Sequence, residues 1–432
     1  MFNVVDLFAG PGGLSLGFEM IKNSNGERGF RTLKAIEMDP WACKTLRKNF
    51  SEDIVIEADI RKETTKNLIE KTCKGKTDIV VAGPPCQSFS LIGPRSGRSR
   101  RLDPNKYDNL YMDFIEIVKR LSPKFFVFEN VKGIISKKNG NERVIDVIIS
   151  ELTTKMGYKC GDGKNYLLLN AADYGVPQIR ERVFIIGNNI GVENPVPQKT
   201  HFDPKINSLT KWNQEMLPYV TIFDAIGDLP RVKARKTMTK ISKKRKIEIE
   251  KYNEKVNSGT DHTKYLSEWK RNHMKKIEKT GKQFINFVRP SVKIPLTHHC
   301  ARPQMESDIQ LFTGMKEGTC AKDVFESTNP KLRKLSRLIK YDMNSFMDKY
   351  KKHKWDKPCS TIFAHLQKDG NRFIHPNQAR TFTPREAARI QSFPDSFFFE
   401  GPVTKKFQQI GNAVPPLLAK KLAEAIYFEI IK

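Results

Sequence analysis

The chain has 432 residues, enough for one large domain plus a smaller one. Its 76 Lys and Arg outnumber 48 Asp and Glu, and the net charge of +28 favours a polyanionic partner such as nucleic acid; a solvated basic surface is the alternative. Seven cysteines without a C-x-x-C pair argue against a disulfide scaffold and a structural zinc site, so no metal is expected. No apolar run approaches membrane-spanning length and no signal segment begins the chain, so we expect a soluble, cytoplasmic protein.

The first predicted elements form a nucleotide-type binding unit. A strand over residues 3–8 runs into a glycine turn over residues 9–13, and a helix starts near Leu14. The dinucleotide fingerprint G-x-G-x-x-G is incomplete, since Ser15 stands where its third glycine should be. A looser third position suits S-adenosylmethionine, which needs close backbone approach but no pyrophosphate cradle. A tight turn without a ligand is the alternative interpretation.

Acidic residues follow the next two predicted strands. Residues 33–36 form a strand that ends in Glu37, and Pro40 opens a helix at its first turn. We expect Glu37 to accept hydrogen bonds from both ribose hydroxyls of a cofactor. A third strand, residues 54–56, leads to Asp59, which could accept a hydrogen bond from an adenine amino group. Either acid could instead be an ordinary loop residue.

The fourth predicted strand leads into the sequence G-P-P-C-Q-S-F-S at residues 83–90. Cys86 therefore stands at the carboxyl edge of an α/β sheet, where such folds bind ligands, and Pro84 and Pro85 stiffen its turn. A thiolate is the strongest side-chain nucleophile near neutral pH, so we interpret Cys86 as a nucleophile. A buried structural cysteine is the alternative. The arginine-rich stretch at residues 91–101 is interpreted as a lid that closes over the thiol and holds phosphate, or else as a solvated linker.

A second candidate catalytic residue follows the fifth predicted strand. Residues 124–128 form an apolar strand that ends at Glu129. A carboxyl group that is partly removed from water at this edge would have a raised pKa and could act as an acid. Farther along, residues 178–187 form a strand on which Arg180 and Arg182 alternate and so point to one face. They would act together, as site residues or as a surface stripe.

The middle of the chain has a different pattern. Residues 190–379 lack the regular alternation of strands and helices, and residues 231–290 contain 19 Lys and Arg against 6 Asp and Glu. Aromatic residues are interleaved with these charges. We predict a DNA-reading domain here, with charge for phosphates and irregular loops for base edges. A disordered basic insertion over residues 232–282 is the alternative.

Regular structure is predicted again near the end of the chain. Thr383 reads as the N-cap of a helix with Pro384 at the first helical position, and Glu386 completes a capping box. A terminal helix runs through Ile431 and should pack on the α/β sheet, since no other large core is predicted.

These segments together resemble the DNA (cytosine-5)-methyltransferase family of the bacterial restriction–modification type. The matching stretches, in the family's order, are D-L-F-A-G-P-G-G, A-I-E-M-D-P, A-D-I, G-P-P-C-Q-S-F-S, F-E-N-V, Q-I-R-E-R, R-T-F-T-P-R-E-A-A-R-I-Q-S-F-P-D and Q-I-G-N-A-V-P. The resemblance implies an α/β fold: a Rossmann-like, S-adenosylmethionine-dependent methyltransferase domain plus a smaller, irregular target-recognition domain. The catalytic domain would comprise residues 1–190, completed by 400–432, and the target-recognition domain residues 191–399, with a Lys-rich insertion around 232–282.

The resemblance also implies roles for individual positions. The catalytic residues would be Cys86 as the nucleophile, Glu129 as the acid on cytosine N3, and Arg180 and Arg182 around the flipped base. The cofactor would be surrounded by Phe8, Gly10, Gly12, Gly13, Leu14, Glu37, Met38, Asp59, Ile60, Pro84, Asn412 and Val414. The DNA would be contacted by Gln87, Ser90, Arg98, Arg100 and Arg101.

The implied activity is methyl transfer from S-adenosylmethionine to C5 of a flipped-out cytosine in double-stranded DNA, through a covalent Cys–C6 intermediate, with S-adenosylhomocysteine as the product. The implied protein is a monomer, associated with the nucleoid through DNA, with a cognate restriction endonuclease as a functional partner. The alternatives are an RNA cytosine-5 methyltransferase on the same scaffold and a non-catalytic DNA-binding regulator. The recognition sequence cannot be read from the irregular region.

Overall fold

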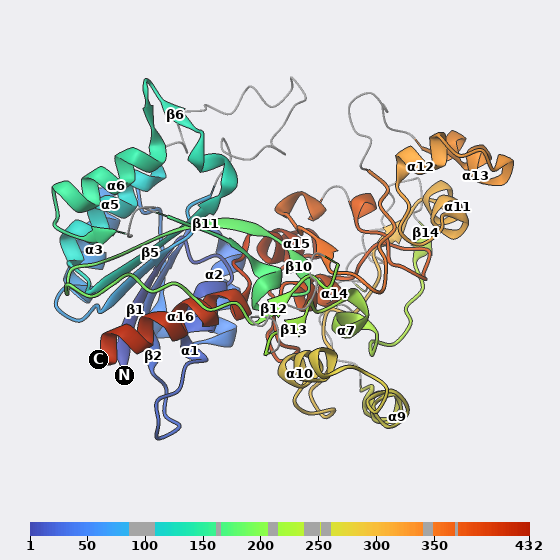
Figure 1. The fold of residues 1–432 in the computed structure, drawn as a ribbon, viewed down its shortest axis with the longest axis horizontal. Helices are drawn as coiled ribbons and strands as arrows, with labels where there is room; N and C mark the ends of the chain where they lie inside the picture. Colours follow the sequence, from blue (N-terminus) through green and yellow to red (C-terminus); the bar gives the residue numbers. More distant parts are fainter. Residues whose placement is uncertain are drawn as a thin grey trace. The chain divides into compact units, whose positions relative to one another are not determined.

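The computed structural model describes residues 1–85, 109–160, 166–205, 215–236, 251, 261–339, 349–367 and 370–432. The chain divides into two compact units (Figure 1). Unit 1 contains Met1–Tyr174, Arg180–Thr200 and Ala413–Lys432, and unit 2 contains Gly175–Ile179 and His201–Asn412. This division groups residues that pack together. It does not test the functional domains expected from the sequence, whose boundaries at 190 and 399 stay a prediction.

Unit 1 is built on an eight-stranded mixed sheet in the order β3-β2-β1-β4-β5-β11-β8, with β9 also paired to β11. The strands are β1 (Phe2–Leu7), β2 (Phe30–Glu37), β3 (Val55–Glu57), β4 (Ile79–Ala82), β5 (Phe125–Val131), β8 (Lys159–Cys160), β9 (Leu167–Asn170) and β11 (Glu181–Asn188). The strands from β3 to β5 are parallel, whereas β11 runs antiparallel to β5, β8 and β9. The predicted α/β class with a Rossmann-like sheet is confirmed.

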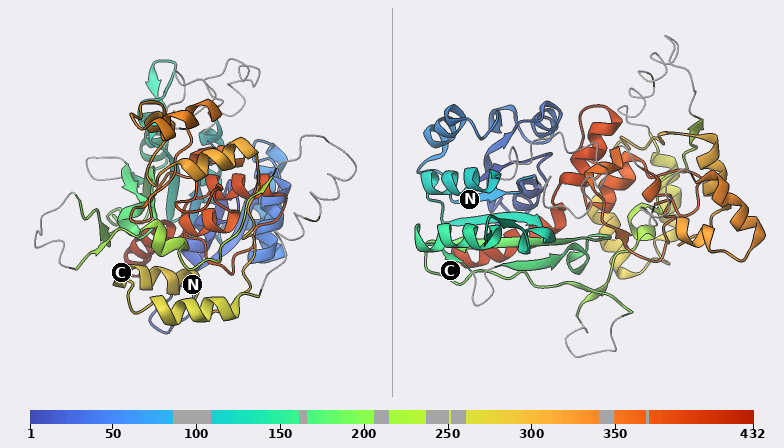
Figure 2. Two further views of the ribbon diagram at one scale, coloured as in Figure 1. Left: turned by 90° about the vertical axis from the view of Figure 1, so that its right-hand side faces the viewer. Right: turned by 90° about the horizontal axis from the view of Figure 1, so that it is seen from above.

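Helices cover both faces of this sheet, as continuous apolar strands such as β4 require. Apolar side chains of α3, α5 and α6 form one core with the strands, while α2 packs against the opposite face. Phe18 of α1 and Tyr427 of α16 form edge-to-face contacts with Phe30 of β2. Figure 2 shows the sheet and its helices from two further directions. The helices of unit 1 are α1 (Gly13–Glu19), α2 (Pro40–Asn49), α3 (Glu63–Cys73), α5 (Leu110–Leu121), α6 (Val144–Thr154) and α16 (Pro416–Ile431).

The short connecting elements of unit 1 follow local turn chemistry. Gly140, with φ 62°, turns the hairpin of β6 (Lys138–Asn139) and β7 (Glu142–Arg143). The 3-10 helices of this unit are Glu52–Ile54, Lys132–Ile135 and Ala171–Tyr174. At α2, the predicted start is confirmed: Pro40 is the first helical residue, and Asp39 accepts hydrogen bonds from the backbone N–H groups of Trp41 and Ala42.

Unit 2 consists of short helices joined by irregular segments. Its helices are α7 (Ile222–Ile226), α9 (Thr263–His273), α10 (Lys279–Val288), α11 (Glu306–Gly314), α12 (Ala321–Phe325), α13 (Pro330–Lys334), α14 (Pro384–Ile390) and α15 (Val403–Asn412), with 3-10 helices at Leu335–Leu338, Ala364–Gln367 and Gly370–Arg372. Its two-residue strands pair β10 (Gln178–Ile179) with β16 (Cys359–Ser360), β12 (His201–Phe202) with β13 (Leu217–Pro218), and β14 (Arg235–Lys236) with β15 (Pro303–Gln304). In the residues that the structure describes, no helix combines the length and apolarity needed to cross a membrane.

The core of unit 2 contains a network of buried charges around α14. Arg389 pairs with Asp228 and Asp395, and Arg289 donates from Nε to Asp395 at 2.6 Å. All four side chains are nearly inaccessible to water. The predicted capping box of α14 is also confirmed. The hydroxyl of Thr383 accepts the backbone N–H of Glu386, and the carboxylate of Glu386 accepts the backbone N–H of Thr383. These charges hold together segments that lie more than 100 residues apart in the sequence.

Candidate active site

The strand β1 ends in a turn whose backbone is left-handed at three positions. Gly10 (φ 56°) and Gly12 (φ 92°) lie in the left-handed region, and Phe8 enters the same region with φ 57°. A phenylalanine rarely adopts this conformation, and such strain clusters at binding sites. At Gly13, a Cβ atom would lie only 2.2 Å from the carbonyl oxygen of Val414. The glycine turn therefore packs directly against the segment that precedes α16.

A buried acid that the sequence analysis missed ties α1 to β1. The hydroxyl of Ser15 donates to Asp6 Oδ2 at 2.6 Å, and the Ser15 backbone N–H points to the same oxygen at 3.3 Å. Burial raises the pKa of Asp6 to about 7, against the lowering effect of these two hydrogen bonds. The hydroxyl explains why the third glycine of a dinucleotide fingerprint is absent. The signal was visible as an acid inside the apolar strand V-V-D-L.

Glu37, at the end of β2, is bonded to the glycine turn. Its Oε2 accepts the N–H of Gly10 at 2.8 Å, and its Oε1 accepts the N–H groups of Met38 and Asp39, each at 2.8 Å. Burial raises the pKa of Glu37, while these backbone donors lower it. A carboxylate offers about four acceptor positions, so three backbone bonds leave room for one further donor.

Asp59 lies on the next connection along the same sheet edge. The backbone N–H of Ala58 donates to the carbonyl oxygen of Glu37 at 3.0 Å and so holds the two acidic segments side by side. Arg61 donates from Nε to Asp59 Oδ1 at 2.9 Å and from Nη2 to Oδ2 at 2.5 Å. This hydrogen bonding lowers the pKa of Asp59. Met38, between the two acids, is 51% exposed and offers an apolar surface at the edge.

Glu129, on β5, is a buried carboxyl group beside the start of the G-P-P-C segment. It is 7% exposed and forms an ion pair with Arg182 Nε at 3.0 Å. A Cβ atom at Gly83 would lie 3.3 Å from Glu129 Oε2, so the glycine before the two prolines adjoins this carboxyl. Burial raises the pKa of Glu129, and the charges of Arg182 and Arg180 only partly offset it. The geometry thus favours a carboxyl group that can hold a proton.

Arg180 and Arg182 have different partners in unit 1. Arg182 pairs with Glu129, as described, whereas Arg180 is 2% exposed and donates from Nη2 to the carbonyl oxygen of Ala413 at 3.1 Å. Both cations act on Glu129 electrostatically. Arg180 also anchors the start of the terminal segment. Arg182 therefore positions the carboxyl of Glu129, and Arg180 holds the segment that packs against the glycine turn.

Comparison with known proteins identifies the family. Residues 2–427 match the family described as C-5 cytosine-specific DNA methylase. The chain belongs to this family. It is a DNA (cytosine-5)-methyltransferase, and the resemblance inferred from its motifs is confirmed.

The similarity extends over whole relatives of this methyltransferase. It is 34% identical to the type II methyltransferase M.DdeI of Desulfomicrobium norvegicum over 99% of this chain and 90% of that protein. It is 31% identical to the type II methyltransferase M1.HphI of Haemophilus parahaemolyticus over 98% of this chain and 86% of that protein. A crystal structure described as a DNA modification methyltransferase encoded within an E. coli prophage has the same fold, with a TM-score of 0.61, 23% identity and full coverage of both chains.

The structure of the methyltransferase brings most of the expected site residues to one sheet edge. The residues placed within unit 1 are Phe8, Gly10, Gly12, Gly13, Leu14, Glu37, Met38, Asp59, Ile60, Pro84, Glu129, Arg180, Arg182 and Val414. Asn412 is exposed and ends α15, which belongs to unit 2. The residues that lie outside the described ranges are Cys86, Gln87, Ser90, Arg98, Arg100 and Arg101. Across those described ranges, no group of three or more His, Cys, Asp or Glu could hold a metal ion.

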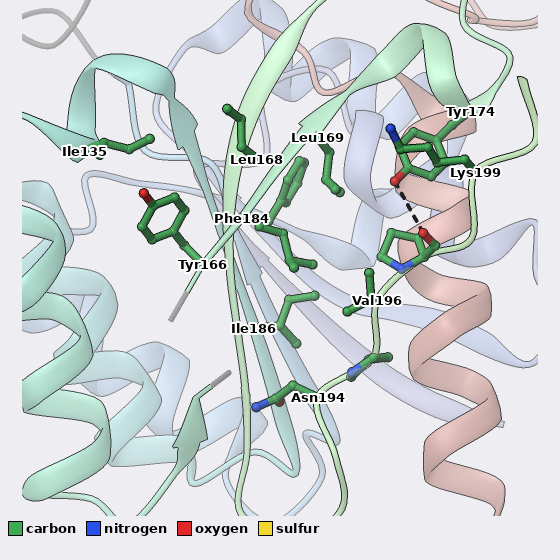
Figure 3. A pocket seen from close by; sticks show the side chains of 13 residues that line it. Ile135, Tyr166, Leu168, Leu169, Tyr174, Phe184, Ile186, Asn194, Val196 and Lys199 are labelled. Carbon is green, nitrogen blue, oxygen red and sulfur yellow. Dashed lines mark hydrogen bonds between the residues drawn. The ribbon is translucent and has the colours of Figure 1, made fainter. Parts of the chain in front are cut away.

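A cavity of about 620 Å³ in unit 1 contains none of the expected site residues (Figure 3). Its walls are mainly apolar side chains of β9, β11 and the segment 194–197. Two of its polar groups already have partners: the Tyr174 hydroxyl donates to the carbonyl oxygen of Pro197 at 3.3 Å, and Lys199 pairs with Asp173 at 2.7 Å. The cavity therefore offers neither an acid nor a nucleophile for methyl transfer.

Proposed function

We propose that this methyltransferase transfers a methyl group from S-adenosylmethionine to C5 of a cytosine that is flipped out of double-stranded DNA, through a covalent bond from Cys86 to C6. The observation that carries the proposal is the buried Glu129, paired with Arg182 and in contact with Gly83 of the G-P-P-C segment. An acid with a raised pKa, adjoining a glycine that lies three residues before the expected nucleophile, is what activation of a pyrimidine ring needs.

The residues at the edge of β1, β2 and β3 fit S-adenosylmethionine. The glycine turn permits close approach, and the strained Phe8 marks it as a binding turn. Glu37 keeps one acceptor position beyond its three backbone bonds, so it would bind one ribose hydroxyl directly, one fewer than the two expected from the sequence. Asp59, Met38 and Ile60 would surround the adenine. When bound, S-adenosylmethionine supplies an electrophilic methyl group.

The protein's own groups would prepare cytosine for that transfer. The Cys86 thiolate adds to C6 while Glu129 donates its proton to N3, and the ring becomes an enamine with electron density at C5. C5 then takes the methyl group. Loss of the C5 proton to a base and expulsion of the thiolate restore the aromatic ring. Since C6 is covered by stacked neighbours in a duplex, the base must first leave the helix.

Arg182 and Arg180 would control the acid rather than the ring. Arg182 fixes the Glu129 carboxyl through the 3.0 Å contact and limits the rise of its pKa. Without this cation, a carboxyl group buried to this degree would hold its proton too strongly to release and recover it at neutral pH. Arg180 keeps the acid connected to the segment that packs on the glycine turn.

A trapping experiment tests the covalent step. A duplex that carries 5-fluorocytosine in place of the target should form a denaturation-resistant complex, because the fluorine cannot leave as a proton does. Cys86→Ala should form no complex and transfer no labelled methyl group, whereas Cys320→Ser, a change at a half-exposed cysteine of unit 2, should behave as the unmodified protein. Methyl transfer by Cys86→Ala would refute the mechanism.

The biological setting that we propose is protection of host DNA, alone or with a cognate restriction endonuclease, by a monomeric enzyme bound to the nucleoid. The match to a DNA methylase family and to two relatives named type II methyltransferases supports duplex DNA over RNA as substrate. Bisulfite sequencing of duplex DNA treated with the pure protein should show one methylated sequence context. Methylation of RNA alone would overturn the substrate proposed here.

A further inference from the structure

The surface around α9 carries cations that have no ionic partners. Residues 261–282 contain seven Lys and Arg against three Asp and Glu. The cations are Lys264, Lys270, Arg271, Lys275, Lys276, Lys279 and Lys282. Within the part of the chain that the structure describes, none of these seven forms an ion pair. Unneutralised charge on one side of a domain raises its local potential and attracts an anion.

A groove at the end of α9 collects several of the groups that bind phosphate. It has a volume of about 430 Å³ and is lined by Ser267, Lys270, Arg271, Pro290, Ser291 and Val292. Its lining residues therefore include one arginine, one lysine and two serines, and no acidic residue is among them. Arginine can grip a phosphate with two parallel N–H bonds, while lysine and serine add single donors.

The α9 wall of the groove is anchored in an apolar core. Trp269 is 8% exposed and packs with Ile277 and Ile285 of the neighbouring α10 segment. The ring of His273 stacks on Trp269 at 5.0 Å, and its Nδ1 lies 3.0 Å from the Trp269 carbonyl oxygen. These contacts fix the last turn of α9, from which Lys270 and Arg271 project to solvent.

The opposite wall is held by the buried charge network of unit 2. Arg289, directly before Pro290, donates from Nε to Asp395 at 2.6 Å and from Nη1 to the carbonyl oxygen of Ile294 at 2.7 Å. The turn that carries residues 290–292 is therefore fixed at both ends. Because the backbone of both walls is fixed beforehand, binding an anion here would need to order only the side chains that contact it.

We propose that this groove binds a backbone phosphate of duplex DNA and supports affinity for any duplex, without reading the recognition sequence. The chemistry of the lining groups suits a phosphate, and phosphate contacts position a protein on DNA but carry no sequence information. The inference rests on the proposed action on duplex DNA. It concerns DNA binding alone. The groove could therefore fail to bind phosphate while methyl transfer through Cys86 is upheld, or bind phosphate while that mechanism is refuted.

The test replaces the two cations and measures binding of the full-length protein to two duplexes. One duplex contains the methylated context found by bisulfite sequencing, and the other has that context scrambled. For Lys270→Gln with Arg271→Gln, we expect a roughly 5- to 20-fold weaker Kd for both duplexes and a salt dependence lower by about 1 to 2 in log–log slope. S-adenosylhomocysteine binding, thermal unfolding and kcat at saturating DNA should not change.

Matched variants separate this site from general electrostatics. Lys71→Gln with Lys74→Gln on α3 removes the same charge from unit 1 and should leave both Kd values nearly unchanged, and Arg271→Lys should restore part of the salt slope. Three results would overturn the proposal: an unchanged salt slope, a loss confined to the duplex with the recognition sequence, or an equal loss in the α3 variant. Competition by inorganic phosphate at matched ionic strength, without any difference in duplex binding between the variants, would assign the groove to a free anion instead.

Discussion

Two buried clusters of charge illustrate how the same residue types serve chemistry in one place and structure in another. In unit 1, Glu129 has Arg182 at 3.0 Å, and its pKa remains raised because burial outweighs the cations. In unit 2, burial would also raise the pKa of Asp395, but Arg389, Arg385 and Arg289 hold it well below its usual range. The first carboxyl holds a proton more readily than an exposed glutamate does. The second remains ionised.

The difference follows from how completely the partners compensate for lost hydration. Asp395 accepts from Arg289 and Arg389, and the latter is in turn shared with Asp228. In such a network, the arginine charges and hydrogen bonds stabilise each carboxylate in its ionised form. Among the described residues, Glu129 has one direct ionic partner, and it adjoins Gly83, which lies three positions before the expected nucleophile in the sequence. At Glu129, the partners only partly replace the hydration that the carboxyl loses on burial. This distinguishes the carboxyl expected to react from the structural ones.

The largest effect should come from removing the proton of the reactive carboxyl. Glu129→Gln keeps the shape of the side chain but cannot deliver a proton to N3, so the rate of methyl transfer should fall by about 10²- to 10⁴-fold with unchanged thermal stability. Single-turnover transfer of a labelled methyl group measures this.

The substitution Arg182→Gln removes the cation beside Glu129, so it should raise the pKa of Glu129 further and move the alkaline limb of the pH–rate profile to higher pH. A limb that moves to lower pH would contradict the assignment.

The complementary change in the structural cluster should affect stability instead. Asp228→Asn leaves the Arg389 guanidinium with one counter-charge fewer in a buried site, which should lower the free energy of unfolding by about 3 to 5 kcal/mol. Urea-induced unfolding gives this value. Glu70→Gln, which removes one charge of the surface ion pair between Glu70 of α3 and Lys74, is the control and should have a much smaller effect. Equal effects of the two changes would remove the distinction between buried and exposed pairs.

A third test uses Asp6, a buried acid that lacks a cation. Its pKa of about 7 lies above the value of about 4 in an unfolded chain, so the folded state holds the proton more tightly. Stability from this group is complete below pH 4 and is lost as the pH rises through 7. Asp6→Asn does not titrate, so its stability relative to the unmodified protein should increase by roughly 2 kcal/mol between pH 5 and pH 7. A constant difference across this range would show that Asp6 is already ionised.

The smallest effect concerns the cap of α14, next to the structural cluster. Thr383→Ala removes one hydrogen bond to the backbone of the first helical turn and should lower the free energy of unfolding by about 1 kcal/mol. Thr383→Ser keeps the hydroxyl and should restore most of it. A loss much larger than 2 kcal/mol would mean that the cap also supports Arg380, which is paired with Glu386 in the same turn.

Local patterns in the sequence predicted the features that depend on neighbouring residues. The strand and glycine turn before Gly13, the first helical turn at Pro40 and the capping box at Thr383 all involve contacts within a few positions, and the structure confirms each of them. The alternation of Arg180 and Arg182 predicted a joint role, and both do act on Glu129, although through different contacts.

Features that depend on distant pairs could not be predicted in the same way. No periodicity relates Asp228 or Arg289 to Asp395, since their pairing appears only when segments more than 100 residues apart are packed together. The serine in the glycine turn was visible, but its meaning required the position of Asp6. The role of Cys86 and the function of residues 91–101 stay predictions, because these positions lie outside the described residues.

The contact between Gly13 and Val414 also governs when the protein can become active during its synthesis. The glycine turn is synthesised long before the segment that packs against it, Ala413–Lys432. A nascent chain therefore has most of the sheet but not the neighbour that closes the cofactor turn, and N-terminal parts generally fold while synthesis continues. The cofactor turn should therefore gain this neighbour only after residues 413–432 have been made, and chains that end before them should not modify DNA.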